Sequence, residues 1–330
     1  MNGRCLAAVF TVMVVVLLLP VGVAGQALTA AADSWAPSRT PWGDPDLQGT
    51  WTNTTTTPLQ RPDELAGKQV LAGEELAERD REVSERVNLD NRRGGTGAYN
   101  EFWAERGRLS ARTSLIVDPP DGKLPPRKFR EEQRQVARAE ARRHRPADGP
   151  EDRNLYERCI SRALPGAMMP GFYNHNYQIL QAPGYVVILV EMIHDARIIP
   201  LDGRPHMGQA VRQWLGDSRG RWEGDTLVVE TTNLTDKVNG RSTTVFGASE
   251  NMRLVERFTR VAKATIDYRF TLHDPTEYAT PWTAAIPMTV LDGPLFEYAC
   301  HEGNYAMTNI LSGTRAEEKA TEADATGESR

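Results

Sequence analysis

The stretch Thr265–His273, TIDYRFTLH, alternates between two kinds of side chain. Its even-numbered positions hold Ile, Tyr, Phe and Leu, whereas its odd-numbered positions are polar or charged. This period of two is typical of a β-strand with one face in a core. The preceding stretch, 252–261, has the same character and a short turn joins the two, so we expect an antiparallel pair.

Further strand patterns lie on both sides of this pair, separated by turns rich in glycine, proline and aspartate. They are predicted at 47–53, 113–117, 176–181, 185–192, 196–201, 226–233, 282–291 and 295–300. Strands that follow one another through short connections favour an antiparallel sheet over β-α-β units. The sequence therefore predicts a mainly β fold, a single antiparallel β-barrel or strongly curved sheet of the lipocalin or calycin kind.

The remaining segments define the organisation of the 330-residue chain. An apolar run over 6–19, followed by Pro20 and small residues, predicts a signal peptide at 1–27 that is too short to span a bilayer. A flexible leader is expected at 28–41, a single β-rich domain at 42–320 and a frayed tail at 321–330. Within the domain we predict a charged helical insertion at 126–145 and a C-terminal helix from 307 to 320.

Composition and cysteine content indicate the class of partner and the compartment. A net charge of −5 gives no basic signature for nucleic acid. Cys5 would leave with the signal peptide, so Cys159 and Cys300 remain in a periplasmic or secreted protein. They have one possible intramolecular pairing, and we expect that disulfide; two separate buried thiols are the alternative. After signal cleavage we expect no stable membrane insertion.

Polar clusters where strands begin or end supply the candidates for chemistry. An imidazole beside a carboxylate at a strand end can act as a general base, and a second imidazole lies in the run YNHNYQ, 173–178. The predicted catalytic residues are His301, Glu302 and His175. Strand-embedded glutamates and nearby aromatic residues suit a polar barrel lumen that holds an organic ligand. The predicted ligand-binding residues are Tyr173, Asn174, Asn176, Tyr177, Glu191, His194, Arg197, Trp222, Glu230, Trp282, Asn304 and Tyr305.

Each of these assignments has a structural alternative. The strand glutamates can face outward or form buried pairs, such as Glu256 with Arg257 or Arg269. Familiar motifs are missing: the sequence has no P-loop, no GxGxxG and no CxxC, and the HExxH pattern fails at Tyr305. A GxSxG at 216–220 precedes a hairpin pattern rather than a helix, so we interpret it as a turn. We therefore expect neither a cofactor nor a metal.

Several strings resemble those of a widespread set of exported bacterial proteins without an assigned reaction. They are LQGTWTN (47–53), YNEFW (99–103), EMIHDARIIPLDGRPH (191–206), WLGDSRGRWEGDTLVVETTN (214–233) and YACHEGNYAM (298–307). The resemblance implies export and a β-rich architecture. It implies no activity and assigns no site residue.

The functional hypothesis is an exported β-barrel that binds a small, partly aromatic or apolar organic molecule. One version transforms the molecule by general acid–base chemistry, as in isomerisation, elimination or hydrolysis. Another version is a non-catalytic, lipocalin-like carrier. A further alternative is an envelope interaction protein that uses the Arg-rich helix, since 127–145 carries eight basic and three acidic residues.

Overall fold

The computed structural model describes residues 35–91, 100–144, 147–235 and 249–326. The predicted signal peptide and residues 28–34 of the predicted leader lie outside this part of the chain. From Ala36 onward, the described residues form one structural unit. Among the described residues, no helix has the length and apolar character needed to cross a membrane.

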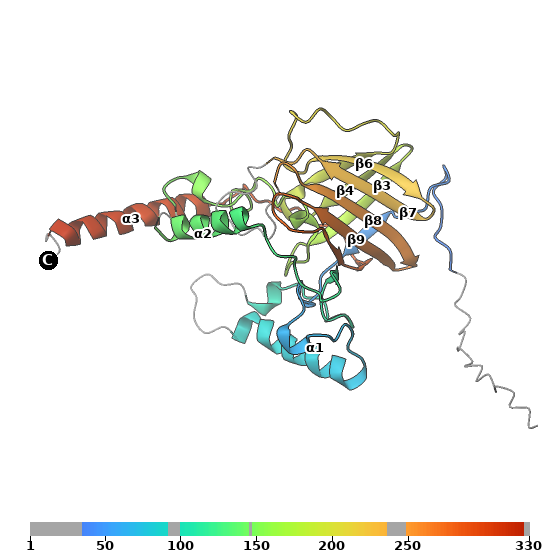
Figure 1. Ribbon diagram of the computed structural model, residues 1–330, viewed down its shortest axis with the longest axis horizontal. Coiled ribbons are helices and arrows are strands. Elements are labelled where there is room, and N and C mark those ends of the chain that lie inside the picture. The colour runs from blue at the N-terminus through green and yellow to red at the C-terminus, as the bar shows by residue number, and fades with distance from the viewer. Residues whose placement is uncertain (1–34, 92–99, 145–146, 236–248, 327–330) are drawn as a thin grey trace, which may run out of the picture. The chain divides into compact units, whose positions relative to one another are not determined.

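The described strands form one antiparallel sheet (Figure 1). They are β1 (Gly49–Thr52), β2 (Ile116–Asp118), β3 (Asn176–Ala182), β4 (Tyr185–Val190), β5 (Ala196–Pro200), β6 (Asp217–Glu223), β7 (Thr226–Thr232), β8 (Arg253–Ala262), β9 (Thr265–His273), β10 (Trp282–Ala285) and β11 (Met288–Val290). The sheet runs in the order β5-β4-β3-β1-β11-β9-β8-β7-β6, and β10 joins β2 to β9. The terminal strands β5 and β6 lie close together, so the sheet is a nearly closed barrel. The predicted mainly β fold is confirmed.

The alternation of β9 places its apolar face in the barrel core. Ile266, Tyr268, Phe270 and Leu272 are all fully buried, and β8 pairs with β9 along its length. The centre of the barrel is filled by large side chains. These are Trp51, Tyr177, Phe258, Tyr268, Phe270 and Trp282. Because these rings pack against one another, the core of the barrel is not the polar lumen that the strand glutamates suggested.

Two predicted strands differ from the structure, and so does the turn that we interpreted at 216–220, because residues 217–220 belong to β6. The segment 282–291 forms two short strands, β10 and β11, because Pro287 has no N–H to donate to a sheet ladder. The segment 295–300 forms no strand. Its backbone instead supports a buried carboxylate: the Phe296 N–H donates to the Glu191 side chain over 2.9 Å.

The helices are α1 (Gly73–Val87), α2 (Phe129–His144) and α3 (Ala306–Thr326), with short 3-10 turns at Asp63–Leu65, Leu89–Asn91, Glu101–Trp103, Pro150–Asp152, Gly166–Met168 and Met192–His194. The helix α2 lies within the predicted insertion. Two of its arginines pair with acidic residues one turn earlier, Arg134 with Glu131 and Arg143 with Glu140. The helix α3 continues to Thr326, into the segment 321–330 that we predicted as a frayed tail.

Candidate functional site

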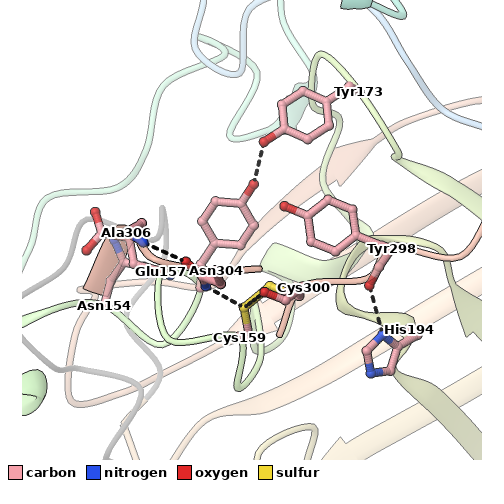
Figure 2. The surroundings of a disulfide bond; sticks show 10 residues. Asn154, Glu157, Cys159, Tyr173, His194, Tyr298, Cys300, Asn304 and Ala306 are labelled. Carbon is pink, nitrogen blue, oxygen red and sulfur yellow. Dashed lines mark hydrogen bonds between the residues drawn. A yellow bond between two sulfur atoms is a disulfide. The ribbon is translucent and has the colours of Figure 1, made fainter. Parts of the chain in front are cut away.

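The disulfide organises one end of the barrel (Figure 2). Cys159 and Cys300 are bonded, with their Cα atoms 5.7 Å apart and a sequence separation of 141. The predicted disulfide is therefore confirmed. It joins the loop that precedes β3 to the segment that precedes α3, and so it brings together the polar clusters found around residues 173 and 300.

Next to the disulfide lies a group that we call the tyrosine–arginine cluster, made of Tyr156, Arg162, Tyr173 and Tyr298. The hydroxyls of Tyr156 and Tyr173 are 2.9 Å apart, and the ring of Tyr173 stacks on that of Tyr298 with centroids 6.4 Å apart. The Arg162 guanidinium lies 5.2 Å above the Tyr156 ring, a cation–π arrangement. Burial raises the pKa of Tyr156, so its phenol remains protonated.

His175 is buried beneath this cluster and both of its ring nitrogens are occupied. Arg162 Nη1 donates to Nε2 over 2.7 Å, and the Nδ1 N–H donates to the Met169 carbonyl over 2.9 Å. Burial and the Arg162 charge lower the pKa of His175 to about 3. A Cβ at Gly171 would lie 1.8 Å from Nε2, so only glycine leaves room for the ring. In this arrangement His175 has no free lone pair with which to act as a base.

The connection from β4 to β5 is a strained turn at the same end of the barrel. Ile193 has φ 65° and His194 has φ 51°, both in the left-handed region. Such conformations cost of order 1–3 kcal/mol each and gather at functional sites. Of the six non-glycine residues with positive φ in the described part of the chain, five lie in this turn or in the loop that precedes β3. They are Cys159, Ala163, Asn174, Ile193 and His194.

A cavity of about 380 Å³ lies beside this turn, and we call it the Glu191 cavity. It is lined by Thr50, Gln178, Leu189, Val190, Glu191, His194, Pro294, Leu295, Phe296 and Glu297. The Glu191 side chain accepts from Asn176 Nδ2 at 2.7 Å and from the Phe296 N–H. Glu191 is 3% exposed, and no cationic side chain in the described part of the chain pairs with it.

His194 is the second functional group of the cavity. Its Nδ1 N–H donates to the Tyr298 carbonyl over 3.2 Å, as Figure 2 shows. That bond sets the tautomer and leaves the Nε2 lone pair without a hydrogen bond to any residue that the structure describes. The buried Glu191 and the exposed His194 thus both line one cavity.

A second carboxylate, which the sequence analysis did not select, lies close to the first. Glu105 Oε2 accepts from the Asn174 N–H at 3.1 Å and from Asn176 Nδ2 at 3.0 Å. The amide of Asn176 therefore bridges Glu105 and Glu191. Its Oδ1 is buried and has no hydrogen-bond partner in the described part of the structure. No local pattern around 105 could have revealed this contact, because it depends on how the 100–110 segment meets β3.

The other predicted acidic and basic residues are distributed between the core and the outer face. Arg197 reaches into the barrel and pairs with Glu256, and the Tyr268 hydroxyl donates to the same carboxylate at 2.9 Å. The alternative of a buried pair therefore holds for Glu256, but with Arg197 rather than Arg257 or Arg269. Glu230 faces outward, where its pairing with Arg253 lowers its pKa.

The remaining predicted residues lie away from the Glu191 cavity. Trp282 and Tyr177 belong to the core, and the half-buried Trp222 packs against it. Asn304 Nδ2 lies 3.2 Å from Cys159 Sγ and so supports the disulfide. His301, Glu302 and Tyr305 are exposed, and none of them lines the Glu191 cavity.

No family model, no curated protein and no solved structure matches this chain. Its geometry defines a nearly closed antiparallel barrel with a packed core and polar groups gathered at one disulfide-linked end.

Proposed function

We propose that this is an exported protein that binds a small, partly apolar organic molecule in the Glu191 cavity. The observation that carries the proposal is the environment of Glu191, which is buried beside a cavity and whose side chain accepts, among the described residues, from two neutral donors. Burial of a carboxylate without a counter-charge is costly, so a ligand that supplies a donor or a positive charge would compensate it. The barrel-like fold and the disulfide are compatible with an exported binding protein.

The lining indicates what the ligand offers to the protein. Leu189, Leu295 and Phe296 provide apolar contact, and Glu191 provides an acceptor. A volume of about 380 Å³ is within the range of small-molecule sites. We expect a compact molecule with an apolar body and an amine or hydroxyl group that approaches Glu191.

The enzymatic version of the proposal uses the same two groups. Glu191 and the free nitrogen of His194 would act as a general acid–base pair, which moves protons in an isomerisation, elimination or hydrolysis without a covalent intermediate. In the carrier version these groups only orient the ligand. Turnover separates the two versions, because the carrier returns its ligand unchanged.

The test is native mass spectrometry of the mature protein purified from its producing cells, compared with the denatured mass. We expect extra mass that is lost on denaturation and that the variant Glu191→Gln does not retain. The matched control is Glu302→Gln, an exposed glutamate that does not line the cavity. If no mass is retained, a library of small organic amines and alcohols is screened by thermal shift. The absence of any ligand whose binding depends on Glu191 would refute the proposal.

A further inference from the structure

The barrel is closed at one end of the β5–β6 seam and open at the other. No backbone ladder joins these terminal strands. At the closed end, a Cβ on Gly220 would lie 2.5 Å from Leu201 and 2.9 Å from Ile199, so a larger residue would force these side chains to shift. At the open end, a cleft of about 630 Å³ lies between residues 195–198 and residues 212–218. We call it the seam cleft.

The register of β5 leaves backbone groups along this cleft that pair with no strand of the described structure. The Val190 N–H bonds to the Asp195 carbonyl, and in an antiparallel pair such bonding recurs at every second residue. Residues 197 and 199 therefore bond to β4. The N–H and C=O groups of Ala196 and Ile198 point the other way, toward the seam.

The register of β6 has the same consequence. A two-residue turn, Gly224–Asp225, joins β6 to β7, so the pair Glu223 and Thr226 that closes it exchanges hydrogen bonds. Counting back by twos, residues 221, 219 and 217 bond to β7. The backbone groups of Ser218 and Gly220 point toward the seam, and Ser218 lines the cleft.

Arg197 adds a buried donor at the same place. Its Nη1 and Nη2 bind Glu256, while its Nε is buried and has no hydrogen-bond partner within the described residues. Arg197 also lines the seam cleft. Since Glu256 already compensates the positive charge, Arg197 does not favour an anionic occupant of the cleft.

We propose that the seam cleft binds an extended, largely uncharged peptide segment of a partner protein, which is added to the barrel edge as a strand. An extended peptide offers alternating N–H and C=O groups, which match the free groups of Ala196, Ile198 and Ser218. Four residues, 195–198, would be covered, about 13 Å of strand. The cleft carries both signs of charge, from Asp195, Asp217 and Arg212, so it does not select a strongly charged peptide.

The exposed edge of β5 supports this assignment. Ile198 is 63% exposed on a terminal strand, and natural proteins usually protect such an edge with charge, proline or a bulge. In β5 such a proline, Pro200, stands at the closed end of the seam; beside the cleft, and within the described residues, the edge is exposed, which is the arrangement used for strand addition. This site is separate from the Glu191 cavity and does not depend on the function proposed there.

The experiment selects random octapeptides on the mature, disulfide-bonded protein by phage display and measures their affinities by calorimetry. The variant Ile198→Pro removes the seam-facing N–H and leaves the β4 ladder intact, because proline is tolerated at a strand edge. The matched control Ile198→Ala retains that N–H. We expect selected peptides to bind at least ten times more weakly to Ile198→Pro and within about threefold of the original affinity to Ile198→Ala, with melting temperatures confirming that both variants fold.

Methylation of the backbone nitrogens at alternate peptide positions provides a second, ligand-side readout. Methylation of the odd-numbered or of the even-numbered peptide nitrogens gives two methylation phases. One phase should abolish binding and the other should not, because only one set of N–H groups faces the strand edge. The proposal is overturned if selection yields no binding peptide, if Ile198→Pro binds as well as the original protein, or if the two methylation phases behave alike.

Discussion

The buried pair of Arg197 and Glu256 allows the sharpest test of the packing. We expect Glu256→Gln to lower the free energy of unfolding by about 3–5 kcal/mol, because it leaves the guanidinium in the core without its counter-charge. The side chains are 1% and 0% exposed, so solvent does not screen the pair. At about 2 °C per kcal/mol for a domain of this size, the melting temperature should fall by about 6–10 °C.

Urea unfolding followed by circular dichroism measures this loss of stability. Two further variants test whether the loss comes from the buried charge. The matched control Glu230→Gln removes a carboxylate from an outward-facing pair with Arg253 and should cost less than about 1 kcal/mol. The double variant Arg197→Met with Glu256→Gln removes both charges and keeps an acceptor for the Tyr268 hydroxyl. It should recover at least half of the loss.

One result would refute the reasoning about this pair. If Glu256→Gln costs no more than Glu230→Gln, the Arg197 guanidinium is not trapped in a dry core and water reaches it, most directly through the seam cleft. If the double variant is as unstable as the single one, the loss comes from packing rather than from charge.

Three further predictions concern the disulfide-linked end of the barrel. Replacing Cys159 and Cys300 with alanine should lower the free energy of unfolding by about 5 kcal/mol, because the disulfide closes a loop across a sequence separation of 141. The urea midpoint should therefore fall, and an unchanged midpoint would contradict this prediction. Burial and the Arg162 charge lower the pKa of His175 to about 3, below the unfolded value of about 6.5, so the unfolded chain binds the extra proton on acidification. Stability should therefore fall by about 1.4 kcal/mol per pH unit from pH 6 to 3, and a variant His175→Gln, compared by urea unfolding at each pH, should lack this component; equal slopes would contradict it. Finally, His194→Gly should raise the free energy of unfolding by about 1 kcal/mol, because glycine adopts φ 51° without strain. The same variant should abolish ligand binding. A lower melting temperature would contradict this and show that the imidazole stabilises the fold instead.

Much of the fold could be predicted because strand patterns are local. The alternation in Thr265–His273 determines which side chains share a face, since successive side chains of a strand point in opposite directions. The disulfide was predictable for a different reason: after the expected loss of Cys5, two cysteines have only one partner each. Turn residues separated most of the strands correctly, and Pro287 divided one predicted strand in two.

The candidate site was only partly predictable. Glu191 could be selected as a carboxylate inside an apolar run, and His194 as an imidazole at a strand junction. In the structure both residues line one cavity. Glu105 and Tyr298 carried no such signal. Glu105 lies in a segment without periodic structure, and Tyr298 lies in 295–300, where the predicted strand does not form. Neither segment contains a pattern that specifies a neighbour.

Periodicity therefore determined the faces of the strands, and the tertiary structure decided which residues meet. Arg197 and Glu256 lie on strands separated by most of the sheet order, and they pair only because the sheet curves until β5 approaches β6. A period of two specifies that a side chain points inward but not which residue it contacts, because that partner depends on the closure and register of the whole barrel. For the same reason the seam between β5 and β6, whose backbone groups pair with no described strand, exists only in the folded protein.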